Sequence, residues 1–533
     1  MWIAAEAEGK PIEDEKGERH PIRDPENKED VPIYVLFDAS PDDFELSNEN
    51  TQLQVITLPP AGKGDSTKAC LKLRPKRVSS SERDLATVAV HFFYNFSAVE
   101  SVEIKAEVLE EGDDLPLSHF YLSMPIKATY RKLGDWVQLE DVDRREMTIF
   151  VNSSGNDRYQ LTFAYGGLEY KGALRLTKQE LEDIILEIRE KLEYLAVDQN
   201  SPIKHRKRYA FKTHVHELAE LGGILWVKLF ESEENKSLWQ TSQFLKQFPV
   251  ETGGTIQVII KPDAAGFMFP WNLLYDGEFP LDSKAVPEDI LEGFWGMRYC
   301  IEQAPLDRME RKWRCKPVQL GEHLMLSFML KKDLPNADAQ KRLMADLAQR
   351  SQHKIAVNEP IINADACFNL LRDNDSDILY FYSRGYTRRR RADIAFKPDT
   401  TREKSHIELS EGKLYLRQLE LSKRQIALRK EPVVILNMCE SAQITPSLSE
   451  GFIPFFLEQG AVAVVGTECA MTTDFAHPFA EAFFESFLRG NPLGRALLTA
   501  RRKFLQPDEF MAPLGLAYAL YGLATLRYKP SPL

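Results

Sequence analysis

One short stretch constrains the fold of this chain more than any other: an apolar run that ends at an asparagine and a cysteine. Val433–Leu436 are four apolar residues in a row, three of them β-branched. Such a run is typical of a strand buried on both faces, as in a parallel sheet. It stops at Asn437, and Cys439 follows. Working residues of open α/β sheets lie at this carboxyl edge, so Cys439 is either a nucleophile or a small buried side chain.

The second half of the chain alternates strand-like and helix-like segments around this stretch. Apolar, strand-like runs occur at 255–260, 324–330, 378–382, 433–436 and 461–466. Helical periodicity occurs at 339–350, 364–371, 452–459, 476–488 and 493–505. This alternation predicts an α/β fold with a mostly parallel sheet flanked by helices.

The first half has a different pattern. Residues 1–30 are charged and carry almost no apolar periodicity, which predicts a flexible leader. From Val31, strand-like runs separated by Pro, Gly, Ser and Asp clusters predict an all-β, sandwich-like interaction domain over 31–175. We expect a helical linker and the start of the α/β region at 176–245, and the α/β domain itself at 246–533.

Composition narrows the class of protein. The net charge of −12 argues against general nucleic-acid binding. Six cysteines without C-x-x-C spacing indicate reduced thiols rather than disulfides or a zinc site. The amino terminus has no signal-peptide pattern, and no apolar run approaches the length of a membrane span. We therefore expect a cytoplasmic protein with no membrane contact, no metal and no cofactor.

Several ordered motifs in the second half resemble one family. They are Phe269–Leu274, Val433–Ala442, Gly451–Thr467, Pro492–Leu497 and Tyr518–Arg527. Together they resemble the CHAT domain of bacterial proteins, a caspase- and separase-related cysteine peptidase module that often lies beside a β-rich domain. The resemblance implies a caspase-like fold over 246–533. It also implies an endopeptidase in a bacterial immune or cell-death pathway that a partner protein regulates.

The resemblance also assigns catalytic positions. A caspase-like peptidase needs a thiolate nucleophile and a neighbouring imidazole that moves protons. Cys439 matches the nucleophile, and Gly385 matches the glycine that follows the catalytic histidine. The backbone N–H groups of these two residues would stabilise the oxyanion. Arg384 stands at the histidine position. Arginine keeps its proton at any working pH, so it favours a thiolate but cannot act as general base or acid.

Three alternatives follow from this departure. The first is a cysteine endopeptidase that acts on a protein substrate. The second is a pseudopeptidase that serves as a binding or regulatory scaffold for a partner protein. The third is that the natural chain carries histidine at 384. Intact Cys439 and Gly385 favour the first alternative, and Arg384 favours the second.

Other polar residues lie near these motifs in the sequence. Asp393 and Glu440 are candidates for a pocket that binds a basic substrate side chain. Arg388–Arg391 is either a patch for an anionic partner or a solvated loop face. His406 and His353 are the nearest histidines that could replace the missing one, although most histidines of this kind are ordinary surface residues.

Overall fold

The computed structural model of this chain describes two compact units. The described residues are 30–39, 43–46, 52–58, 67–71, 73–76, 86–94, 97–106, 127–132, 144–153, 159–166, 168–174, 178–231, 236–261, 264, 267, 269–279, 286–305, 319–320, 323–350, 355–373, 375–386, 405–438, 451–506 and 509–528. Unit 1 comprises 1–148, 163–169 and 309–317, and unit 2 comprises 149–162, 170–308 and 318–533. The predicted leader lies almost wholly outside the described residues.

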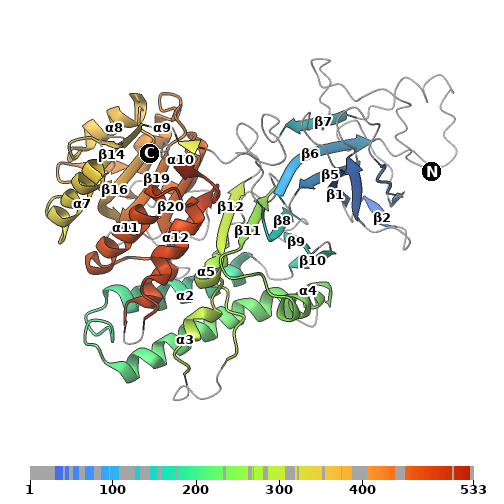
Figure 1. The fold of residues 1–533 in the computed structure, drawn as a ribbon, viewed down its shortest axis with the longest axis horizontal. Coiled ribbons are helices and arrows are strands. Elements are labelled where there is room, and N and C mark those ends of the chain that lie inside the picture. Colours follow the sequence, from blue (N-terminus) through green and yellow to red (C-terminus); the bar gives the residue numbers. More distant parts are fainter. Residues whose placement is uncertain are drawn as a thin grey trace, which may run out of the picture. The chain divides into compact units, whose positions relative to one another are not determined.

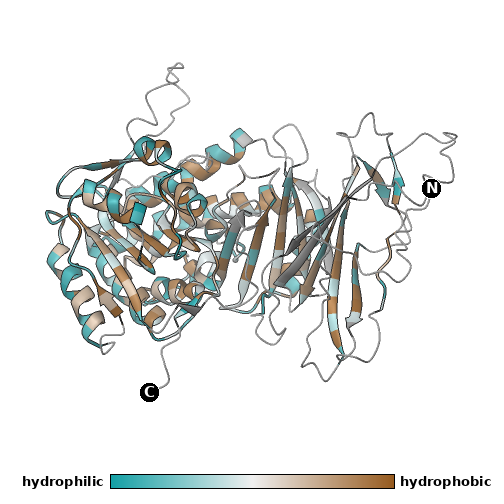
Figure 2. Ribbon diagram, turned by 90° about the horizontal axis from the view of Figure 1, so that it is seen from above, coloured by the Kyte–Doolittle hydropathy of each residue, from teal (hydrophilic) through white to brown (hydrophobic). Residues whose placement is uncertain are grey.

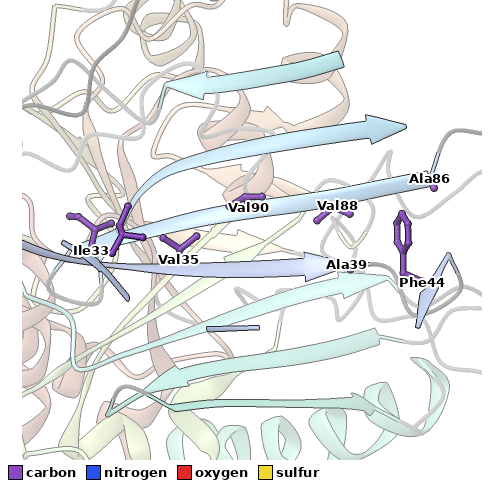
Figure 3. Packing of buried hydrophobic residues seen from close by; sticks show 8 residues of the cluster. Ile33, Val35, Ala39, Phe44, Ala86, Val88 and Val90 are labelled. Atoms are coloured by element: carbon purple, nitrogen blue, oxygen red, sulfur yellow. The ribbon is translucent and has the colours of Figure 1, made fainter. Parts of the chain in front are cut away.

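Unit 1 contains a five-stranded antiparallel sheet in the order β3-β1-β5-β6-β7. These strands are β1 (Val31–Ala39), β3 (Leu53–Leu58), β5 (Ala86–Tyr94), β6 (Ser97–Ala106) and β7 (Lys127–Lys132). A two-stranded sheet pairs β2 (Phe44–Leu46) with β4 (Leu73–Pro75). Alternate residues of β1 and β5, among them Ile33, Val35, Val88 and Val90, form a buried cluster that Phe44 joins (Figure 3). This period of two is the reason that the sequence reads as strands here.

Unit 2 is organised by a large, mostly parallel sheet with the order β10-β9-β8-β11-β12-β21-β20-β19-β16-β14-β15 (Figure 1). Its strands are β8 (Met147–Ser153), β9 (Tyr159–Tyr165), β10 (Leu168–Leu174), β11 (Thr255–Ile260), β12 (Cys300–Pro305), β14 (Leu324–Leu330), β15 (Ile355–Val357), β16 (Ile378–Tyr386), β19 (Val433–Met438), β20 (Ala463–Thr467) and β21 (Tyr518–Gly522). The predicted mostly parallel sheet is confirmed. β8, β9 and β10, which the sequence groups with the N-terminal strands, are hydrogen-bonded into this sheet, while the domain limits stay a prediction.

Helices flank the strands of unit 2. The longer ones are α2 (Lys178–Val197), α3 (Arg208–Trp226), α4 (Lys236–Gln247), α7 (Ala337–Arg350), α8 (Ala364–Asp373), α11 (Thr473–Leu488) and α12 (Leu493–Arg502). The shorter ones are η2 (Val227–Glu231), η4 (Trp271–Leu273), η6 (Ile290–Gly293), α5 (Trp295–Arg298), α9 (Leu416–Leu421), α10 (Phe452–Glu458) and η8 (Ala512–Ala517). Two small pairings complete the fold: β17 (His406–Glu408) pairs antiparallel with β18 (Lys413–Tyr415), and β13 (Gln319–Leu320) pairs in parallel with β22 (Arg527–Tyr528). Figure 2 shows the strands largely in brown and the helices with many teal residues.

Two neighbouring residues of β16 identify which helices cover which face of the sheet. The Tyr380 hydroxyl donates a hydrogen bond to Gln340 of α7, and its ring packs edge-on against Phe484 of α11. The Phe381 ring instead contacts Phe456 of α10. Successive side chains of a strand point to opposite faces. α7 and α11 therefore cover one face of the sheet at β16, and α10 covers the other.

Candidate functional site

The site that the sequence predicts lies where two adjacent parallel strands end. β16 and β19 pair in register from Ile378↔Val433 to Ser383↔Met438. All six residues of β19 are buried, as the apolar run predicts. Because the strands are parallel and in register, their carboxyl ends meet at one edge of the sheet. Residues 384 and 439 each follow one member of the last register pair.

Of the predicted catalytic positions, the structure describes Arg384 and Gly385 but not Cys439. Arg384 continues β16 beyond Ser383 and is half-buried, and Gly385 after it is buried. By strand alternation, Arg384 shares a face with Tyr380 and Tyr382, which is the face covered by α7 and α11. Cys439 follows Met438 in the chain but lies outside the described residues. The same holds for Asp393, Glu440, His353 and the run Arg388–Arg391.

Charged side chains surround Arg384. Its register partner across the antiparallel pairing of β16 with β17 is Glu408. Lys331, which is buried, lies 3.3 Å from a Glu408 carboxylate oxygen and 3.1 Å from that of Asp333. Burial acts to raise the pKa of Asp333, but its hydrogen bond to Lys331 and the charges of Lys331 and Arg384 bring that pKa below its ordinary value. Lys331 thus pairs with both carboxylates, and the charge of Arg384 also acts on Asp333.

His406 is the candidate for a replacement base that lies within the described residues. It lies near Arg384, but on the edge of β16 opposite to β19. It is the register partner of Tyr386 in β17, is 8% exposed, and its ring centroid is 5.4 Å from that of Tyr415. The segment after β17 contacts the end of β14, because Ser410 accepts a hydrogen bond from the Lys332 backbone at 2.7 Å. β19 pairs along the other edge of β16. This arrangement argues against His406 as a proton carrier for a group that follows β19.

A hydrogen-bond network that the sequence did not single out holds the end of β19. The Asn437 side-chain amide donates to the Tyr380 hydroxyl and to the Ala476 carbonyl of α11, both at 2.9 Å. The Tyr518 hydroxyl donates to the side-chain amide oxygen of Asn437 at 2.6 Å. Asn437 is 1% exposed, so these bonds replace water. The only signal in the sequence is a polar residue that ends an apolar run.

We expect Asn437→Leu to lower the free energy of unfolding by about 1–3 kcal/mol, because it leaves the buried Tyr518 hydroxyl and Ala476 carbonyl without their partner. Tyr518→Phe should cost less, since Asn437 keeps its other two bonds. Urea unfolding of both variants measures the difference. Equal stability of Asn437→Leu and the unaltered chain would show that the network adds nothing.

A buried ion pair lies at the same edge of the sheet, beyond β20. Glu468 accepts hydrogen bonds from Arg189 of α2 at 2.9 Å and from the Tyr521 hydroxyl at 2.8 Å. Glu468 is 1% exposed and Arg189 6%. Burial, together with the charge of Glu468, raises the pKa of Tyr521 well above its ordinary value. This pair connects α2 to the sheet next to the strand that leads to Cys439.

The described part of the chain has no candidate membrane span and no candidate metal cluster. None of its helices combines the length and the apolar character needed to cross a bilayer. Nor does it bring three or more His, Cys, Asp or Glu side chains together in a group that could hold a metal ion.

Comparison with known proteins places these elements in context. A family model described as "CHAT domain" matches residues 235–521. A probable protease of Vitiosangium sp. is 35% identical over 97 residues, which are 18% of this chain and 12% of that protein. The aligned part is thus a small fraction of the relative. Two structures of the Saccharomyces cerevisiae separase–securin complex align with 72% and 71% of this chain and 30% of theirs. Their sequence identities are 13% and 12%, and their TM-scores are 0.43 and 0.40.

Proposed function

This chain belongs to the CHAT-domain family, whose model matches more than half of its length, and we propose that it is a caspase-like cysteine endopeptidase module with Cys439 as its nucleophile. One observation carries this proposal: β16 and β19 are adjacent, parallel and in register up to Ser383↔Met438. Arg384 is the next residue of β16, and Cys439 is the residue that follows β19 in the sequence. An attacking thiol and the group that activates it need such neighbouring positions.

With arginine at 384, we propose a reaction in which the thiolate attack is supported but protonation of the leaving amine is not. The Cys439 thiolate attacks the substrate carbonyl, and the resulting oxyanion accepts hydrogen bonds from the backbone N–H groups of Gly385 and Cys439. The positive charge of Arg384 favours the thiolate. Arg384 cannot donate a proton to the leaving amine, and loss of acid–base assistance costs about 10²–10⁴-fold in rate. We therefore propose a thiolate that electrophiles alkylate readily but that turns over peptides slowly, because the amine has no proton donor when the acyl-enzyme forms.

The substrate and setting are further parts of the proposal. Asp393 and Glu440 would bind a basic side chain of a protein substrate through charge. The family resemblance supports a role in a bacterial immune or cell-death pathway with regulation by a partner protein. The free thiols of Cys70, Cys300 and Cys367 support the cytoplasm, a reducing compartment, as the place of action.

The charges around Arg384 favour a second candidate function. Glu408 is the register partner of Arg384, and the charge of Arg384 helps to lower the pKa of Asp333, so acidic residues lie near the arginine. A pseudopeptidase that binds or regulates a partner protein fits this arrangement.

Thiol labelling tests the proposed nucleophile. At neutral pH, we expect iodoacetamide to alkylate Cys439 faster than exposed Cys70, because a nearby cation favours the thiolate. Cys300 and Cys367 serve as internal controls that stay unlabelled, since burial raises their pKa values to about 11 and about 12. Peptide mapping by mass spectrometry gives the rates. Labelling of Cys439 no faster than Cys70, or an unchanged rate in Arg384→Gln, contradicts the proposed activation.

Cleavage separates the two candidate functions. The unaltered chain and Cys439→Ala are incubated with candidate partner proteins, and the products are identified by mass spectrometry. Specific cuts by the unaltered chain that disappear in Cys439→Ala exclude the pseudopeptidase. Partner binding without cuts by either chain supports it.

A further inference from the structure

Unit 2 contains a cavity of about 250 Å³ that the proposed peptidase site does not use. It lies between the first turns of α3, the segment 286–292 that includes the start of η6, and residues 505, 506, 509, 510 and 512, which follow α12 and reach the start of η8. Its apolar lining includes Phe211, Val215, Val286, Ile290, Leu291 and Phe510. Val215, Val286, Ile290 and Leu291 are buried, and the rings of Phe211 and Phe510 touch with centroids 4.9 Å apart. The cavity therefore has an apolar floor and an aromatic wall.

The size of the cavity indicates what kind of group it holds. Pockets for free drug-sized ligands have volumes of about 300–1,000 Å³. A cavity below that range matches one large side chain presented by a bigger molecule. Large apolar or aromatic anchors that enter a pocket of this kind supply much of the affinity of protein–protein contacts.

The charges of the lining indicate what should flank that side chain. Glu288, Asp289, Glu292 and Glu509 face two basic residues, Arg208 and Lys212. Arg208 pairs with Glu288 at 3.1 Å, and Arg502 pairs with Glu292 at 3.2 Å. The two remaining negative charges, on Asp289 and Glu509, exceed the one remaining positive charge, on Lys212. The net negative charge around the cavity therefore favours a cation beside the apolar side chain that enters it.

We propose that this cavity is a docking site for a segment of a partner protein that inserts an aromatic or large aliphatic side chain flanked by basic residues. The wall of the cavity also connects with the carboxyl edge of the sheet. Ala512 lines the cavity and begins η8, which leads directly into Tyr518, the donor to Asn437. Arg501 reinforces this connection by donating to the carbonyls of Gly296 and Tyr518.

Two peptides of opposite charge test the proposal on the full chain. The probes are N-acetyl-Arg-Phe-Arg amide and N-acetyl-Glu-Phe-Glu amide, which share the aromatic anchor, and ligand-observed NMR titration gives their affinities. We expect the basic peptide to bind at least tenfold more tightly, and the double variant Asp289→Lys/Glu509→Lys to reverse the preference. Equal affinity of both peptides, or a preference that the double variant leaves unchanged, overturns the proposal.

A blocking variant locates the binding. Gln506 is exposed and lines the cavity, so Gln506→Trp should fill its mouth and weaken the basic peptide at least tenfold. Gln349 is exposed on α7 and does not line the cavity, and Gln349→Trp should leave the affinity unchanged. Urea unfolding checks that all variants remain folded. Equal weakening in both tryptophan variants, or in neither, places the peptide elsewhere and overturns the assignment. Tight binding of 4-phenylbutylammonium without binding of the basic peptide overturns it in favour of a small-molecule site.

Discussion

Arg384→His is expected to raise the rate of peptide cleavage by about 10²–10⁴-fold, because it restores a side chain that takes up and releases protons near neutral pH. Position 384 directly follows Ser383, the register partner of Met438, so an imidazole there begins one residue beyond the last described pair of β16 and β19. Release of a fluorescent amine from peptide amides with a basic residue before the scissile bond measures kcat/KM. An amide substrate is needed because its leaving group requires a proton.

The pH profile distinguishes restored proton transfer from a general change in the site. The variant should gain a dependence on a group with a pKa near 6.5, the ordinary value for histidine, which the unaltered chain lacks. Arg384→Lys keeps a positive charge and should gain neither rate nor this dependence. The double variant Arg384→His/Cys439→Ala should be inactive. If Arg384→His is no faster than the unaltered chain, residue 384 is not the proton-transfer position.

Arg189→Met is expected to lower the free energy of unfolding by about 3–5 kcal/mol, because it leaves the buried Glu468 carboxylate without its cation. The Tyr521 hydrogen bond remains, yet a single neutral donor does not replace the guanidinium. Urea unfolding with an unchanged m-value gives the loss. The double variant Arg189→Met/Glu468→Leu should recover most of it, since apolar replacement of both members of a buried pair is often neutral.

The exposed pair of Arg489 and Glu485 provides the matched control. These residues lie four apart on α11 and its end, and their side chains are 72% and 45% exposed. Water screens such a pair, so Arg489→Met should change stability by about 0.5 kcal/mol or less. A loss in Arg189→Met no larger than this would show that the buried pair does not hold α2 to the sheet.

The sequence is informative where a local pattern determines the structure. The apolar run before Asn437 predicts β19, and alternating strands and helices predict the parallel sheet, because burial on both faces removes polar residues from such strands. The pairing of Arg384 with Glu408 and the bond of Asn437 to Tyr518 join segments far apart in the chain, and no local pattern reports them. The same holds for β8, β9 and β10, because alternation marks a half-exposed strand without showing which sheet it joins.

The position of β21 has a consequence for the order of events during synthesis. Within the large sheet, β21 is the last strand in the chain, yet it lies in the interior between β12 and β20 and is antiparallel to β20. The strands from β8 to β12 and those from β14 to β20 therefore share no strand pairing until β21 has left the ribosome. Domains fold as their segments emerge, and contacts between distant segments form late. Since Tyr518 belongs to β21, the bond that holds Asn437 forms only then. A chain whose translation stops before β21 accordingly lacks the brace behind Cys439.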